Sequence, residues 1–229
     1  MLVAFEGQDG AGKTALLEAV HAGLQRRGIA SVMLEEFSDS PYGRQLVRAV
    51  ARDKFLRPVA DDAATPITRT LEEVADLYYF DERIIGPALA CGHKGLKDRH
   101  RDTIFYTLTP TLVTSGTIAN EERVLGWLTA LCSELLHPPD LTVYVWAPLS
   151  IRLERIARRP GHFAEGRAHK ASDEDRAVFA ARDRIIAWLI AKEPTRFLTV
   201  DNGEHPIEKG AQEVVEAIFK RQTRTEDAL

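Results

Sequence analysis

The residues best suited to chemistry form a glycine-rich loop near the N-terminus. In order, the loop contains Gly7, Gln8, Asp9, Gly10, Ala11, Gly12, Lys13 and Thr14, which fits the pattern GxxxxGK[ST] at every position. In such a loop, backbone N–H groups surround phosphate oxygens, the lysine contacts the β- and γ-phosphates, and the hydroxyl holds Mg²⁺. The pattern therefore predicts a site for a nucleoside triphosphate with its magnesium ion.

The segments on either side of the loop have the structure that the motif requires. Leu2 to Phe5 is an apolar run bounded by glycine, which predicts a buried strand. Lys13 to Arg27 is predicted to be a helix, because its apolar residues recur on one face. The N-terminus of that helix adds the positive end of its dipole beside the phosphates.

Features elsewhere in the chain narrow the class of triphosphate-binding protein. There is no Asn-Lys-x-Asp guanine signature, and the apolar run that ends at Trp146 has no acidic residue at its end to hold a metal-bound water. A glycine-rich basic inset at residues 160–171 instead suits a lid that closes over phosphates, as in a small kinase. Arg167 lies in this inset and is the candidate for stabilising the transferred charge on closure.

Short apolar segments alternate with helical ones along the whole chain. We expect strands at Leu2–Phe5, Ser31–Leu34, His93–Asp98, Leu141–Trp146 and Phe197–Val200. We expect helices at Lys13–Arg27, Tyr42–Arg52, Thr68–Leu89, Leu149–Arg159, from Ser172 onward, and Ile207–Phe219, and within Thr107–Leu136 in at least its second half. This alternation predicts an α/β, P-loop NTPase-like fold, with about five parallel strands, helices on both faces and a short lid.

The third strand has the weakest signal, because Lys94, Gly95 and Lys97 are unusual in a buried parallel strand. We expect residues 1–229 to form a single kinase domain that ends in a polar tail at 223–229. Ligands of such a sheet bind at the carboxyl ends of the strands. The functional residues are therefore expected just after each strand.

Composition limits the other classes of protein to consider. The 229 residues are 45% hydrophobic and 28% charged, which favours a packed core and excludes global disorder. No run approaches 18 apolar residues, and the first residues carry no basic leader, so we expect a cytoplasmic protein without a membrane span. The net charge of −4 argues against a nucleic-acid surface. Cys91 and Cys132 lack metal-ligand spacing.

Several segments together resemble the thymidylate kinase family. Phe5–Thr14 is similar to the opening of these enzymes, which also carry an aspartate inside the loop. The sequence Pro-Ala-Leu-Ala-Cys-Gly at 87–92, followed at matching spacing by Asp98-Arg99-His100, resembles another family stretch. Further matches are at 139–141, 153–159 and 200–202. The likeness covers nearly the whole chain.

The resemblance implies ATP-dependent, Mg²⁺-dependent phosphorylation of a deoxynucleoside monophosphate, such as dTMP to dTDP, by a homodimer. It implies that Asp9 approaches the 3′-hydroxyl of the acceptor, that Asp98 faces Mg²⁺ together with Thr14, and that Arg99 faces the phosphates. Together with Lys13 and Arg167, these residues form the expected catalytic set. Arg158, or Arg155, is expected against the adenine.

The acceptor side departs from the family pattern in two places. The family has an arginine for the acceptor phosphate after the second strand, where this chain has Glu35, Glu36 and Phe37 and no arginine until Arg44. We expect Glu36 and Phe37 to lie in the acceptor site, with Arg44, Arg48 or Arg83 supplying the charge.

The second departure concerns the base. The family places an aromatic residue and, four positions later, an arginine on the helix at 68–89. Matching by residue type gives Tyr79 and Arg83, which share a helical face with Glu72 and Asp76. Counting back from Pro87 at the family's spacing gives Glu73 and Leu77 instead.

Two other functions remain open at this point. A glutamate after the second strand is similar to the base of deoxynucleoside kinases, so Glu36 is a candidate to take the proton from a 5′-hydroxyl. The fold is also compatible with a nucleotide-binding module without turnover, although Lys13, Thr14 and Asp98 argue against that reading.

Overall fold

The computed structural model of the chain describes residues 1–53, 64–158, 172–203 and 205–226. The expected lid at 160–171, with Arg167, lies outside the described residues. The strands are β1 (Leu2–Glu6), β2 (Ser31–Leu34), β3 (Lys94–Asp98), β4 (Leu141–Trp146) and β5 (Phe197–Asp201). The α-helices are α1 (Lys13–Arg26), α2 (Pro41–Arg52), α3 (Pro66–Phe80), α4 (Gly86–Ala90), α5 (Arg101–Thr114), α6 (Glu121–Leu131), α7 (Leu149–Ala157), α8 (Asp173–Lys192) and α9 (Ile207–Glu226).

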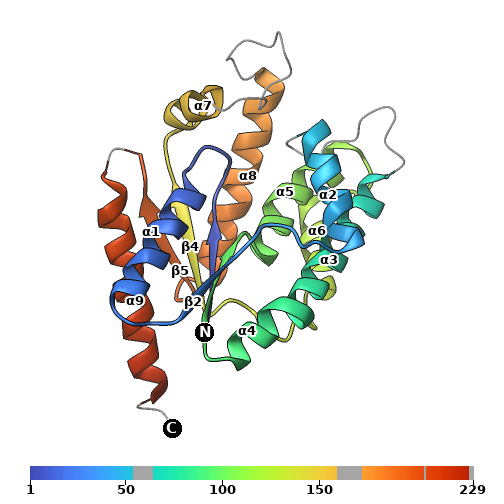
Figure 1. Cartoon of the computed structure of the whole chain (residues 1–229). Coiled ribbons are helices and arrows are strands. Elements are labelled where there is room, and N and C mark those ends of the chain that lie inside the picture. The colour runs from blue at the N-terminus through green and yellow to red at the C-terminus, as the bar shows by residue number, and fades with distance from the viewer. Residues whose placement is uncertain (54–63, 159–171, 204, 227–229) are drawn as a thin grey trace.

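The strands form one parallel sheet in the order β2-β3-β1-β4-β5. This confirms the α/β, P-loop NTPase-like architecture that the alternating pattern predicted. In Figure 1 the N-terminus lies at one end of the sheet, and the loop from β1 to α1 lies at the opposite end, close to α7. That opposite end carries the carboxyl ends of the strands, where ligands of such sheets bind.

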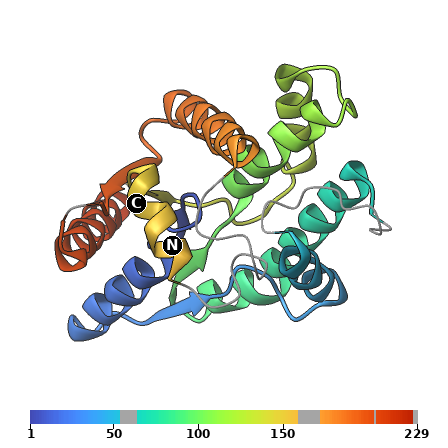
Figure 2. The same cartoon turned by 90° about the horizontal axis from the view of Figure 1, so that it is seen from above.

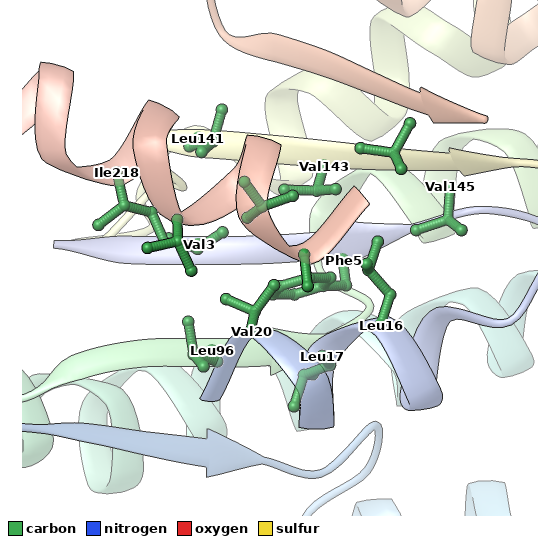
Figure 3. Packing of buried hydrophobic residues seen from close by; sticks show 14 of the residues in the cluster. Val3, Phe5, Leu16, Leu17, Val20, Leu96, Leu141, Val143, Val145 and Ile218 are labelled. Atoms are coloured by element: carbon green, nitrogen blue, oxygen red, sulfur yellow. The ribbon is translucent and has the colours of Figure 1, made fainter. Parts of the chain in front are cut away.

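One face of the sheet is covered by α1 and α9. Alternate residues of β1, Val3 and Phe5, point to this face and are fully buried. Figure 3 shows them packed with residues of neighbouring strands and of the two helices, including Leu96, Val143, Leu16, Leu17, Val20 and Ile218. This apolar layer fixes α1, and with it the loop before α1, against the centre of the sheet.

The other face is covered mainly by α3, α5 and α8, with α6 packed against α5. Figure 2 shows α5 and α8, in green and orange, across the sheet from α1 and α9, in blue and red. The start of α8 is fixed by a capping box, in which Ser172 and Asp175 bond each other's backbone N–H groups. These helices form the walls of the space above β1 and β3.

Three helical segments differ from the sequence prediction. The segment predicted as a helix at 68–89 is divided by a π-helical turn at Asp81–Ile85. The segment 107–136, predicted as helical in at least its second half, contains α6 in that half, capped by Asn120, but its first part belongs to a separate helix, α5, which begins at Arg101. Finally, α9 continues through residues 223–226 to Glu226.

Of the described helices, none is long and apolar enough to cross a membrane.

Strand β3 is formed despite its lysines. It lies between β1 and β2, and Lys97 is 1% exposed. The Lys97 ammonium lies 4.2 Å from the centroid of the Phe80 ring and donates to the backbone carbonyls of Glu35, Glu36 and Asp98. These contacts join β3 to the loop after β2. Burial lowers the pKa of Lys97 to about 8, against the opposing effect of Glu36 and Asp98.

We predict that Lys97 makes stability depend on pH above neutrality. Folded Lys97 releases its proton near pH 8 and unfolded lysine near 10.5, so the unfolded state binds more protons between these values. The unfolding free energy of the wild type should therefore rise, relative to Lys97→Met, by on the order of 1–3 kcal/mol across that window. Denaturant titrations at several pH values measure this difference.

The matched control is Lys94→Met, which removes a less buried lysine of the same strand. If the two variants differ from the wild type by the same amount at every pH, the prediction for Lys97 is wrong.

Candidate functional site

A cavity of about 240 Å³ opens at the carboxyl ends of β1, β2 and β3. Its polar side carries Asp9, Lys13, Thr14, Glu36, Asp98 and Arg99, and its apolar side includes Phe37, Leu46, Val50, Leu77, Phe80 and Ile104.

The loop between β1 and α1 is too closely packed to accept side chains at its glycines. Gly7 and Gly12 have φ angles of 143° and 93°. A Cβ atom would lie 2.4 Å from the Val145 carbonyl oxygen at Gly7, and 2.2 Å from the Asn202 side-chain nitrogen at Gly12. Glycine is therefore required at these two positions, both for its conformational freedom and for the space it leaves.

Carbonyl oxygens of this loop accept hydrogen bonds from side chains of other segments of the chain. Arg155, on α7, donates to the carbonyls of Gly10 and Ala11 at 3.3 and 3.2 Å. Asn202, after β5, donates to the carbonyl of Ala11 at 2.7 Å. The first N–H groups of α1 have no partner within the helix, so they remain available to an anion. The loop is thus preorganised to bind phosphate oxygens.

Lys13 and Thr14 lie at the start of α1, where the motif predicts them. Lys13 is 7% exposed, and burial, reinforced by the charge of Arg99, lowers the pKa of its ammonium, while Asp98 and Asp9 act in the opposite direction. The Thr14 hydroxyl donates to Asp98 Oδ2 at 3.1 Å. The other carboxylate oxygen of Asp98 is buried and has no hydrogen-bond partner among the described residues.

These oxygens fit a magnesium ion. Mg²⁺ prefers hard oxygen ligands, and it is usually held by one or two protein groups together with waters and phosphate oxygens. Thr14 and Asp98 meet that requirement, each from a fixed element. Within the described part of the chain, no group of three or more His, Cys, Asp or Glu side chains forms a separate metal site.

Arg99 connects three segments that line the cavity: the phosphate loop, the loop after β2 and helix α5. Its guanidinium pairs with Asp9 through Nη2 at 2.5 Å and with Glu36 through Nε at 3.0 Å. Nη1 donates to the Tyr106 hydroxyl at 2.7 Å. The side chain is 10% exposed, so most of its charge is satisfied by these neighbours rather than by water. Asp9 and Glu36 are therefore held on either side of one cation.

Glu6 fixes the segment that carries Arg99. One carboxylate oxygen of Glu6 accepts from the backbone N–H of His100 at 2.7 Å, and the other accepts from the hydroxyls of Thr103 and Tyr106. Burial raises the pKa of Glu6 to about 7. The end of β1 thereby caps the start of α5, immediately after the Asp98–Arg99 pair.

Glu36 and Phe37, which the sequence analysis places in the acceptor site, both line the cavity. Arg44 and Arg48 are exposed on α2 and do not line it. The loop after β2 is instead fixed by Asp76, whose carboxylate accepts from the backbone and hydroxyl of Ser38 and from the Ser40 hydroxyl at 2.9 Å.

Of the two pairs of residues that the sequence offers as contacts to the base, the structure places only one pair at the cavity. Glu73 and Leu77 line the cavity, and Asp76 and Phe80 extend the same face of α3. Tyr79 is half-buried outside the cavity lining, and Arg83 is exposed in the π-helical turn. The spacing from Pro87, rather than the match by residue type, therefore gives the cavity-lining residues. The base contact that we predicted at Tyr79 and Arg83 is not supported by this placement.

Arg158 and Arg155, the two arginines predicted beside the adenine, have different surroundings in the structure. Arg158 is exposed at the end of α7 and pairs with Glu154 one turn earlier. Arg155, the alternative, contacts the phosphate loop and donates to the Asn202 carbonyl at 2.7 Å. Of the two arginines, Arg155 is the one placed against the triphosphate side.

The sequence analysis does not predict two of the charged residues that line the cavity. One is Lys97, although a lysine within an otherwise apolar strand is a sequence signal of a functional or structural role. Arg182, on α8, is 2% exposed and lines the cavity. It lies three residues after Phe179 and three before Ile185, so helical periodicity places it on the buried stripe.

Comparison with known proteins identifies relatives over nearly the full length. The chain is 31% identical to a probable thymidylate kinase of Halorubrum lacusprofundi over 206 residues, which cover 90% of this chain and 91% of the relative. It is 30% identical to the thymidylate kinase of Desulfovibrio desulfuricans over 227 residues (98% and 99%) and 29% identical to that of Geobacter sulfurreducens over 224 residues (97% and 98%). No family model matches the chain.

We predict that Arg99→Lys lowers the free energy of unfolding by about 1–3 kcal/mol. A lysine keeps one positive charge but cannot contact Asp9, Glu36 and Tyr106 together. The effect falls below that of a fully buried broken pair, because the side chains of Asp9 and Glu36 are 21% and 38% exposed. Denaturant titration measures the loss.

The control is Arg101→Lys, two residues further on. Arg101 is 22% exposed and pairs with Glu193 at 3.2 Å. We expect this variant to lose less than about 1 kcal/mol. Equal losses in the two variants would contradict the role assigned to Arg99.

Proposed function

The chain belongs to the thymidylate kinase family, and on this premise we propose that it transfers the γ-phosphoryl group of ATP to the 5′-phosphate of thymidine monophosphate. The observation that carries the proposal is the position of the acceptor cavity. It begins at Asp9 and Lys13 of the phosphate loop and extends to α3 and α5, so a bound acceptor lies beside the end of a bound triphosphate. Such a juxtaposition is what in-line phosphoryl transfer requires.

The donor half holds the triphosphate on the loop at 7–14. Backbone N–H groups and Lys13 bind the phosphates, and Thr14 with Asp98 holds the magnesium ion. When bound, this ion neutralises charge on the β- and γ-phosphates. Because the loop is already fixed by Arg155 and Asn202, little reorganisation is needed as charge develops.

The acceptor half uses Asp9 and Arg99. Asp9 accepts a hydrogen bond from the sugar hydroxyl of the acceptor, and Arg99 supplies positive charge near the phosphoryl groups. Their ion pair orients both groups before any substrate binds. A monophosphate acceptor is itself a sufficient nucleophile, so no strong base is required at the transfer site.

The two alternatives are less favoured. In a nucleoside kinase, Glu36 acts as a base, but here its carboxylate already pairs with Arg99. A binding module without turnover does not need Lys13, Thr14 and Asp98 to be intact and close together, as they are in this chain. Relatives over nearly the whole length also bear the name thymidylate kinase.

Several finer features of the proposal come from the family resemblance. We propose that the whole chain acts as a single kinase domain, that it works with Mg²⁺, and that it forms a homodimer. We further propose that it acts in the cytoplasm on nucleotides, without a nucleic-acid partner.

The test of this function is an ATP-consumption assay with thymidine monophosphate and thymidine in parallel. We expect the monophosphate to be phosphorylated faster. Lys13→Ala should lower kcat by at least about 100-fold, because a charge that stabilises the transition state is lost. An unchanged circular dichroism spectrum would confirm that this variant is folded. A preference for thymidine, or full activity of Lys13→Ala, would refute the proposal.

A second prediction concerns Glu36. Glu36→Gln keeps the size and polarity of the side chain but removes its ability to accept a proton. Because the proposed acceptor needs no such base, kcat should fall by less than tenfold, below the loss of about 10²–10⁴ that follows removal of a general base. The measurement is kcat with thymidine monophosphate at saturating ATP. A collapse of kcat would favour the nucleoside kinase reading.

A further inference from the structure

The cavity-lining face of α3 carries two buried carboxyl groups with different surroundings. Asp76 is saturated by Ser38 and Ser40, so its function is to hold the loop after β2. Glu73 lies one turn earlier, is 6% exposed and lines the cavity. Its Oε1 atom is buried and has no hydrogen-bond partner within the described part of the chain. Glu73 thus has hydrogen-bonding capacity that the fold does not use.

The charges that face Glu73 come from three other parts of the fold as well as from α3 itself. They are Glu36 from the loop after β2, Arg99 after β3, Arg182 from α8, and Arg69 from α3. Burial, followed by repulsion from Glu36, raises the pKa of Glu73 to about 8, against the attraction of the arginines. At neutral pH the group is therefore mostly a neutral carboxyl, with one O–H donor and one carbonyl acceptor.

A neutral carboxyl group matches the imide edge of thymine. That edge presents an N3–H donor between two carbonyl acceptors, so a carboxyl group can accept from N3–H and donate to one adjacent carbonyl. An ionised carboxylate lacks the donor and would repel the carbonyl oxygen. The apolar side chains of Leu77 and Ile104, which line the same cavity, are suited to pack against the faces of a planar ring.

We propose that Glu73 is a specificity-determining residue that reads the imide edge of the acceptor's pyrimidine base. The inference rests on the proposed function, since it assumes that a thymine-bearing monophosphate occupies the cavity. In this chain Tyr79 and Arg83, which match the family's base contacts by residue type, do not line the cavity, and Glu73 with Leu77 is found at the corresponding spacing. A carboxyl group on α3 then replaces a cationic or aromatic contact to the base.

The test compares Glu73→Gln with Glu73→Leu. Glutamine keeps a donor and an acceptor in similar positions, so the KM for thymidine monophosphate should stay within about threefold of the wild type. Leucine removes both, so this KM should rise about 10- to 100-fold, while kcat at saturation changes less. The control is Glu82→Leu, which removes an exposed carboxyl group of the π-helical turn outside the cavity, and its KM should not change. Thermal melts identify any variant that fails to fold.

Two further measurements separate base reading from a structural role. N3-methylthymidine monophosphate lacks the imide donor, so the wild type should discriminate against it by at least about tenfold in kcat/KM and Glu73→Leu should not. Between pH 7 and 9 the KM of the wild type should rise as Glu73 ionises, whereas the KM of Glu73→Gln should rise less. Lys97 is present in both proteins, so its own titration cancels in the comparison.

The outcomes distinguish this inference from the proposed function. If the wild type phosphorylates thymidine monophosphate but Glu73→Leu keeps its KM and its discrimination against the methylated base, the role of Glu73 is refuted and the function stands. If the wild type does not phosphorylate thymidine monophosphate at all, the proposed function is refuted and this inference with it.

Discussion

The ion pairs of Arg99 are the interaction on which the site depends. Arg99 has a φ angle of 60°, a conformation that is uncommon for a residue with a side chain. Its backbone N–H bonds the Phe5 carbonyl at 3.0 Å, and its guanidinium reaches Asp9, Glu36 and Tyr106. The loops after β1 and β2 and the helix after β3 are therefore held by one side chain. Backbone strain at such a position is tolerated only because the surrounding contacts determine it.

Around Arg99, other buried polar groups hold the segments that surround the cavity. Glu6 holds the start of α5, Asp76 holds the loop after β2, and Lys97 holds that same loop through the carbonyl oxygens of Glu35 and Glu36. Burying such groups costs free energy unless they are bonded, and most of these are. Glu73 is one of the buried groups that are not fully bonded: its Oε1 has no hydrogen-bond partner among the described residues, so this carboxyl of α3 has capacity left for a ligand.

The two halves of the site are constrained to different degrees. The donor half consists of backbone groups, glycines and a helix N-terminus, and the triphosphate it binds has a fixed shape, so few residue types are compatible with it. The acceptor half is formed by side chains of α2, α3, α5 and α8. Those side chains can change without altering the phosphate loop. This explains how the chain keeps the complete loop motif while Glu73 and Leu77 line the acceptor cavity.

The sequence determined the phosphate loop and four of the strands, because glycine conformation, side-chain period and helix dipoles are local properties, whereas β3 was expected from the alternation of strands and helices and against its own residue types. It did not determine which face of α3 meets the acceptor. Glu73 and Leu77 are one turn apart on the face of α3 that lines the cavity, whereas Tyr79 lies on another face of the same helix and Arg83 is exposed in the π-helical turn at 81–85. The sequence also did not indicate that Lys97 stabilises a central strand, because its hydrogen-bond partners, the carbonyls of Glu35 and Glu36, are distant in sequence. Such contacts exist only once the sheet has brought the separate loops together, and for that reason only the tertiary structure decided between the two possible faces of α3.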